Sequence, residues 1–183
     1  MDRFLLPPQE TALLMIDFQE KLAAVMKYRE EVVRNGRLLI EAAGLLGIPV
    51  WLTEQYPQGL GSTLPEIRGL LPEVQPLVKT HFDCCREPGF LERITRDGRK
   101  RFILTGMEAH VCVLLTASGL LRQGFKVQVV RDAVCSRKKT DYQTALEWLR
   151  EAGAVITTTE TVIFQFLERS GTEAFKTLSP KIR

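Results

Sequence analysis

Segments of strand length, mostly apolar, alternate along the chain with segments in which apolar residues recur at helical spacing. Uninterrupted apolar runs are typical of parallel strands that are buried on both faces. Six segments predict strands, at residues 12–16, 48–53, 77–80, 101–105, 126–131 and 154–157. Helical spacing over 29–46, closed by Gly47 and followed by Pro49, predicts the first long helix.

The second half of the chain continues this alternation. The apolar segment 113–121 predicts a buried helix after the fourth strand. Thr140 with Gln143 forms a capping-box pattern, which predicts a helix that runs to residue 152. Two short helices are predicted near the end, around 162–167 and 173–178.

This order of elements is the signature of βαβ units. Such units build a parallel sheet with helices on both faces, so we expect an α/β fold of three αβα layers. The irregular stretch 54–76 is typical of a lid, a pocket wall or a loop with a short helix of its own. No linker or internal repeat interrupts the pattern, and we therefore predict a single domain over residues 1–183.

Composition and charge narrow the class of protein. Hydrophobic residues make up 45% and charged residues 26% of the 183 residues, as in ordinary globular proteins. A net charge of +3 without long basic runs argues against a nucleic-acid partner. The start carries no signal-peptide pattern, and no apolar run approaches a membrane span. The four cysteines include no C-x-x-C pair, so we expect a soluble, reduced, cytoplasmic protein without a membrane partner.

Three side chains with chemical potential follow three different strands. Ligands of open parallel sheets bind beyond the carboxyl ends of the strands. Asp17 follows the first strand, Lys79 lies near the end of the third, and Cys112 lies shortly after the fourth. A carboxylate, an ammonium group and a thiol are thereby directed to one rim. Each also has a simpler role open to it, as a helix cap, a surface charge or a buried cysteine.

Cys112 has the strongest individual case, because it opens the apolar segment 113–121. A thiol at a helix N-terminus faces the positive end of the dipole and free N–H groups, so we expect a lowered pKa and an oxyanion site. Asp17 could accept the thiol proton, while Lys79 could hold the carboxylate and stabilise negative charge. The remaining cysteines lack such a setting: Cys84, Cys85 and Cys135.

The two histidines contribute less. His110 lies two residues before Cys112, and side chains two positions apart on a tight turn point in different directions, which favours a pocket wall over a base. His81 is expected in a loop. No cluster of His, Asp or Glu has the spacing of metal ligands, and we predict neither a metal nor a cofactor.

With these residues in this order, the chain resembles the isochorismatase-like cysteine hydrolases. Three separated motifs occur in the family's order, at residues 15–19, 78–79 and 106–113. Segments 53–61 and 131–134 are similar to the branch of isochorismatase domain-containing proteins. The resemblance extends from about residue 11 to residue 167.

The resemblance implies a six-stranded parallel sheet of Rossmann-like order and a catalytic triad of Asp17, Lys79 and Cys112. It also implies a cis peptide between Met107 and Glu108, with the N–H groups of Glu108 and Cys112 as the oxyanion hole. Oligomers are common in the family, so a homo-oligomer is expected. Together with position at the rim, the resemblance gives a set of substrate-binding candidates: Phe18, Gln19, Gln55, Tyr56, Phe82 and His110.

Two departures guide the choice of reaction. Nicotinamidases of the family carry an Asp-x-His segment for a metal, where this chain has Thr53, Glu54 and Gln55. True isochorismatases lack the nucleophilic cysteine that is present here as Cys112. The leading expectation is an enzyme, a cysteine hydrolase (amidase) that cleaves a small amide or carbamoyl C–N bond through a thioester. The alternatives are a nicotinamidase and a non-hydrolytic binding or redox-sensing module that uses Cys112.

Overall fold

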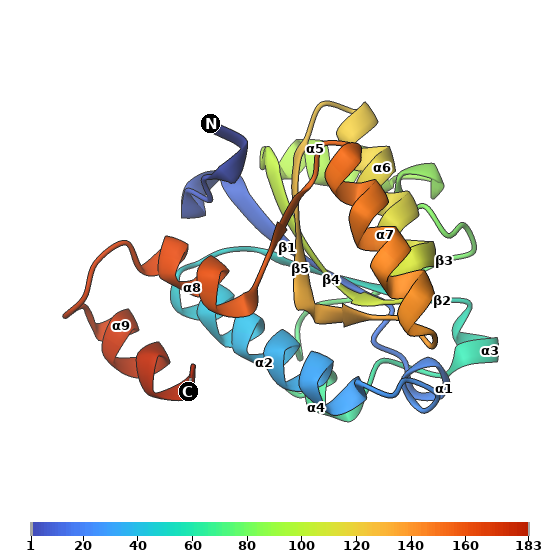
Figure 1. The fold of residues 1–183 in the computed structure, drawn as a ribbon, viewed down its shortest axis with the longest axis horizontal. Helices are drawn as coiled ribbons and strands as arrows, with labels where there is room; N and C mark the ends of the chain where they lie inside the picture. Colours follow the sequence, from blue (N-terminus) through green and yellow to red (C-terminus); the bar gives the residue numbers. More distant parts are fainter. Residues whose placement is uncertain (1, 183) are drawn as a thin grey trace.

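The computed structural model describes residues 2–182 and builds them around one parallel sheet (Figure 1). The strand order is β3-β2-β1-β4-β5-β6, which confirms the predicted six-stranded sheet of Rossmann-like order. All five strand pairs are parallel. The strands are β1 (Thr11–Ile16), β2 (Val50–Gln55), β3 (Leu77–Lys79), β4 (Arg101–Met107), β5 (Lys126–Cys135) and β6 (Val155–Thr157).

Helices cover both faces of this sheet and complete the three predicted layers (Figure 1). The α-helices are α1 (Glu20–Ala23), α2 (Arg29–Leu45), α3 (Pro57–Leu60), α4 (Pro65–Arg68), α5 (Phe90–Asp97), α6 (Leu114–Arg122), α7 (Lys139–Glu151), α8 (Thr159–Leu167) and α9 (Glu173–Leu178). Short 3-10 turns are η1 (Asp2–Phe4), η2 (Pro8–Glu10), η3 (Cys84–Arg86) and η5 (Ser179–Lys181). A single π-helical turn, η4 (Ala109–Val113), follows β4.

The central strand β1 divides the core into two. All six of its residues are buried, and successive side chains point to opposite faces. Leu13 and Met15 join the core that is covered by α2, α4, α8 and α9. Leu14 and Ile16 join the core beneath α5, α6 and α7. A strand that is buried on both faces favours apolar residues, and the charged Asp17 accordingly comes only after its end.

Strand β4 brings the following turn close to the end of β1, and Gly106 makes this possible. Gly106 pairs with Ile16 and adopts a φ of +119°, where other residues are strained. A Cβ atom at this position would lie 1.9 Å from the carbonyl oxygen of Ile16. The close backbone approach therefore requires glycine and places η4 beside Asp17.

The structure corrects several predicted boundaries. Strand β5 extends four residues beyond the prediction, to Cys135, because a register shift between Leu104 and Gly106 lets its second half pair again with β4. The predicted capping box is wrong: Thr140 lies inside α7, whose N-cap is Lys138. Helices α3 and α4 occupy the irregular stretch after β2, as one of the alternatives anticipated. Helices α1 and α5 are additions to the predicted elements.

Among residues 2–182, no helix has both the length and the apolar character needed to cross a bilayer.

Candidate active site

Asp17 and Lys79 form a buried ion pair at the carboxyl end of the sheet. The Lys79 Nζ lies 2.8 Å from Asp17 Oδ2, and neither side chain is exposed to solvent. Asp17 adopts a φ of +53°, a conformation that aspartate tolerates better than most residues and that occurs often at functional sites. Burial lowers the pKa of Lys79, but the Asp17 charge, with smaller contributions from Cys84 and Cys112, raises it overall. Lys79 therefore carries a positive charge at neutral pH.

Cys112 lies on the π-helical turn that follows β4. The peptide bond between Met107 and Glu108 is cis, as the family resemblance implied. The N–H groups of Val111 and Val113 both donate to the Glu108 carbonyl oxygen, so the turn closes around this residue. The Glu108 carboxylate accepts hydrogen bonds from the backbone N–H and the Nε of Arg137, at 3.0 and 3.1 Å. The turn is thus fixed from both sides, with Cys112 5% exposed.

The structure corrects the expected acidity of this thiol. Burial raises the pKa of Cys112, and the Asp17 carboxylate raises it further, while Lys79 lowers it only in part. The turn of five residues does not offset these effects. At neutral pH the resting group is therefore the thiol, and a thiolate forms only when a neighbouring base takes its proton.

Sequence reasoning missed two residues of this neighbourhood. Thr53, in the second half of β2, donates a hydrogen bond of 2.6 Å to Asp17 Oδ1. Cys84 is fully buried near Lys79, and burial raises its pKa to about 12. Its N–H donates to the Thr116 hydroxyl, which holds η3 against α6. Thr53 could have been found from its position at a strand end, as Asp17 was, whereas nothing in the sequence separates Cys84 from Cys85.

Three predicted substrate-binding residues have supporting places instead. Phe18 is fully buried in the core and lies against Gly36 of α2. Gln19 is also fully buried, and its Nε2 donates to the carbonyl oxygens of Gln55 and Gly61. Gln55 donates to the Thr80 carbonyl and accepts from Lys79 Nζ at 2.7 Å. The amides of Gln19 and Gln55 are thus occupied by partners within the protein, and Phe18 belongs to the core, so substrate contact by these three residues stays a prediction.

The other three predicted binding residues lie at the rim. Tyr56 and Phe82, which follow β2 and β3, each expose about half of their surface. The His110 Nδ1 lies 2.9 Å from the Ser136 hydroxyl, and its Nε2 lies 3.8 Å from Asp141 at the start of α7. These side chains remain candidates for substrate contact.

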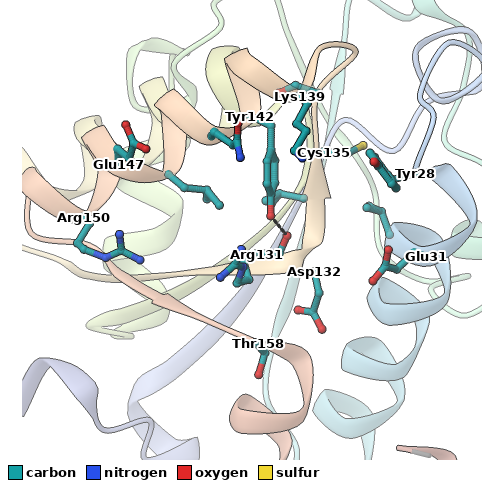
Figure 2. A pocket seen from close by; sticks show the side chains of 15 residues that line it. Tyr28, Glu31, Arg131, Asp132, Cys135, Lys139, Tyr142, Glu147, Arg150 and Thr158 are labelled. Carbon is teal, nitrogen blue, oxygen red and sulfur yellow. Dashed lines mark hydrogen bonds between the residues drawn. The ribbon is translucent and has the colours of Figure 1, made fainter.

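A groove of about 790 Å³ lies apart from the triad, between α2, the second half of β5 and α7. Figure 2 shows side chains of α7 facing Tyr28 and Glu31 across β5. Its charges are balanced, since it is lined by three cations and three acids: Arg131, Lys139, Arg150, Glu31, Asp132 and Glu147. None of the three triad residues lines it, so its size does not make it the active site.

Within residues 2–182, no three His, Cys, Asp or Glu side chains are grouped in a way that could hold a metal ion. The arrangement places a thiol beside a carboxylate and a buried lysine.

The chain is similar to known proteins in both sequence and fold. Residues 11–161 match the model of the isochorismatase domain. The isochorismatase domain-containing protein 2 of Danio rerio is 38% identical over 91% of this chain and 83% of its own length. The MAR1 ribonuclease of Caenorhabditis elegans is 41% identical, with a TM-score of 0.90 over 97% of this chain and 92% of that one. The YcaC product of Escherichia coli, an octameric hydrolase of unknown specificity, shares the fold with a TM-score of 0.91 at 22% identity, over 97% of this chain and 90% of its own.

Proposed function

Since the chain belongs to the isochorismatase domain family, whose members are hydrolases, we propose that it is a cysteine hydrolase of a small amide or carbamoyl C–N bond. The observation that carries the proposal is the fully buried Lys79–Asp17 pair beside the Cys112 thiol. Burying an ion pair is costly, and a structural role alone does not explain its place beside a nucleophile at the ligand-binding edge of the sheet.

In the proposed first half-reaction, Asp17 takes the proton of Cys112 as the sulfur attacks the substrate carbonyl carbon. The C–S bond forms, and the negative charge moves to the carbonyl oxygen. The N–H groups of Glu108 and Cys112 stabilise this oxyanion, and Lys79 adds positive charge nearby. When the tetrahedral intermediate collapses, the C–N bond breaks and the leaving nitrogen takes the proton from Asp17.

In the second half-reaction, water replaces the amine. Asp17, again a carboxylate, takes a proton from water as its oxygen attacks the thioester carbon. Collapse of the second intermediate breaks the C–S bond, and the thiolate recovers the proton from Asp17. The products are ammonia or an amine and the corresponding acid, and the resting thiol–carboxylate pair is restored.

The redox-sensor alternative has less support. Sensor thiols combine a low pKa with exposure to solvent. Burial raises the pKa of Cys112, and the residue is 5% exposed. A thiol that is activated only by an adjacent carboxylate fits a nucleophile that acts after its substrate has bound.

We further propose that the protein is a cytoplasmic homo-oligomer whose partner is a small-molecule substrate. The octameric YcaC has the same fold.

We expect activity to survive exhaustive chelation. The proposed steps use only Cys112, Asp17, Lys79 and backbone N–H groups, and nicotinamidase relatives keep metal ligands where this chain has Thr53 and Gln55. Turnover should be the same before and after dialysis against EDTA. Loss of turnover that zinc or manganese restores would contradict this and favour the nicotinamidase alternative.

The proposed function is tested by measuring ammonia or amine release from a panel of small amides, ureas and carbamoyl compounds. A labelled RNA is included as a comparator, because one relative is a ribonuclease. Turnover of at least one amide or carbamoyl compound is expected. Cleavage of RNA without any C–N hydrolysis would overturn the proposal.

A further inference from the structure

Strand β2 directs two neighbouring polar side chains at the ion pair. Thr53 and Gln55 are two residues apart on the strand, so their side chains point to the same face. Both residues are buried, with exposed fractions of 1% and 7%. The residues of β2 that precede them are apolar, so Thr53 and Gln55 are the polar residues on this face of the strand.

Thr53 contacts Asp17 through both its side chain and its backbone. Its hydroxyl donates to Asp17 Oδ1 at 2.6 Å, and its carbonyl oxygen accepts from the Asp17 N–H at 3.3 Å. Lys79 Nζ donates to the other carboxylate oxygen, Oδ2. The carboxylate is therefore held at both oxygens, which fixes its plane relative to Cys112.

Gln55 holds the cation in the same way. It pairs directly with Lys79 across the two strands, and its Oε1 accepts from Lys79 Nζ at 2.7 Å. Its Nε2 donates to the Thr80 carbonyl oxygen, which orients the amide. Gln19 fixes the strand itself, because its Oε1 accepts from the Gln55 N–H.

We propose that Thr53 and Gln55 are positioning residues, of which Thr53 orients and stabilises the Asp17 carboxylate and Gln55 orients the Lys79 ammonium group. The inference rests on the proposed function, since it concerns the base and the cation of that reaction. A hydroxyl is suited to the Asp17 contact because it can rotate its hydrogen. It donates to the ionised carboxylate and can accept from the protonated acid, whereas Lys79 can only donate.

Few other groups can act on this carboxylate. Lys79 faces it from β3, Cys112 from η4 and Cys84 from η3. Both thiols are neutral at neutral pH, since burial raises the pKa of each. Loss of the Thr53 hydroxyl should therefore be seen directly in the pH dependence of the base.

The test measures the rate at which iodoacetamide alkylates Cys112, followed by peptide mapping from acidic to neutral pH. In Thr53→Val the ionised carboxylate loses a hydrogen-bond donor. The acid limb of the profile, where the alkylation rate falls as the pH is lowered, should therefore move to higher pH by about one unit. This is the size expected for a hydrogen bond to a charged group. Thr53→Ser keeps the hydroxyl and should retain the wild-type limb. Gln55→Met should slow alkylation severalfold without moving the acid limb, because Gln55 contacts the Lys79 ammonium group and not the Asp17 carboxylate.

The folding of each variant is checked by circular dichroism and thermal unfolding. If Thr53→Val does not fold, Thr53→Ala replaces it in the test. A purely structural role would lower stability and leave the limb in place. Wild-type limbs in folded Thr53→Val and Thr53→Ala would overturn the positioning role. Asp17→Asn separates failure of the positioning role from failure of the proposed function. If the alkylation profile of Asp17→Asn equals that of the wild type, Asp17 is not the base and the proposed function fails.

Discussion

Replacing Cys112 with alanine should reduce kcat for C–N hydrolysis by about four orders of magnitude or more. Without the sulfur no thioester can form, and only the residual catalysis that the oxyanion donors and substrate binding provide should remain. The measurement is steady-state kinetics with the best amide of the panel, on protein whose folding is checked by circular dichroism.

Cys84→Ala is the matched control for this variant. Cys84 is also a buried thiol with a raised pKa, and it lies near the same lysine. It is not on the η4 turn, so its removal should change the rate less than tenfold, in the range of small packing effects. A Cys84→Ala enzyme without activity beside an active Cys112→Ala enzyme would reassign the nucleophile.

Lys79→Met should lower kcat/KM about a hundredfold or more, which corresponds to about 3 kcal/mol, the effect of removing one good electrostatic stabiliser. The lysine lowers the pKa of Cys112, so the pH at which the thiol becomes reactive should rise as well. A folded Lys79→Met enzyme with wild-type turnover and an unchanged thiol titration would remove Lys79 from the mechanism.

This variant also needs a stability control. Because both partners of the ion pair are fully buried, Lys79→Met leaves the Asp17 charge without compensation, at a cost of about 3–5 kcal/mol in unfolding free energy. The double variant Asp17→Asn with Lys79→Met removes both charges and should recover much of this stability. The measured rates of Lys79→Met are therefore divided by the fraction of the protein that is folded.

Much of the fold could be predicted because a parallel sheet makes strong demands on sequence. Strands that are buried on both faces require apolar runs, and β1 with its six buried residues is the clearest case. The missing parts depend on tertiary contacts. Helix α5 buries only Phe90 and Ile94, and β5 regains its pairing through a register shift that no local pattern indicates.

The proximity of Asp17, Lys79 and Cys112 could be predicted from strand ends and family motifs, and the structure does place the three side chains together. The acidity of Cys112 could not be predicted from the sequence, because the pKa of the thiol depends on burial and on an aspartate that is distant in sequence. Gln19 and Gln55 stand at strand ends like true ligand contacts, but their hydrogen-bond partners lie within the protein. Only the folded geometry distinguishes a polar group that holds the site from one that meets the substrate.

Trapping the acyl-enzyme tests the central claim most directly. The wild-type protein is mixed with a hydrolysed amide, quenched with acid within the first turnovers and mapped by peptide mass spectrometry. The account predicts an added acyl mass on the peptide that contains Cys112, removable by hydroxylamine and absent from Cys112→Ala. Rapid turnover with no adduct at Cys112, or an acyl group on another residue, would contradict it.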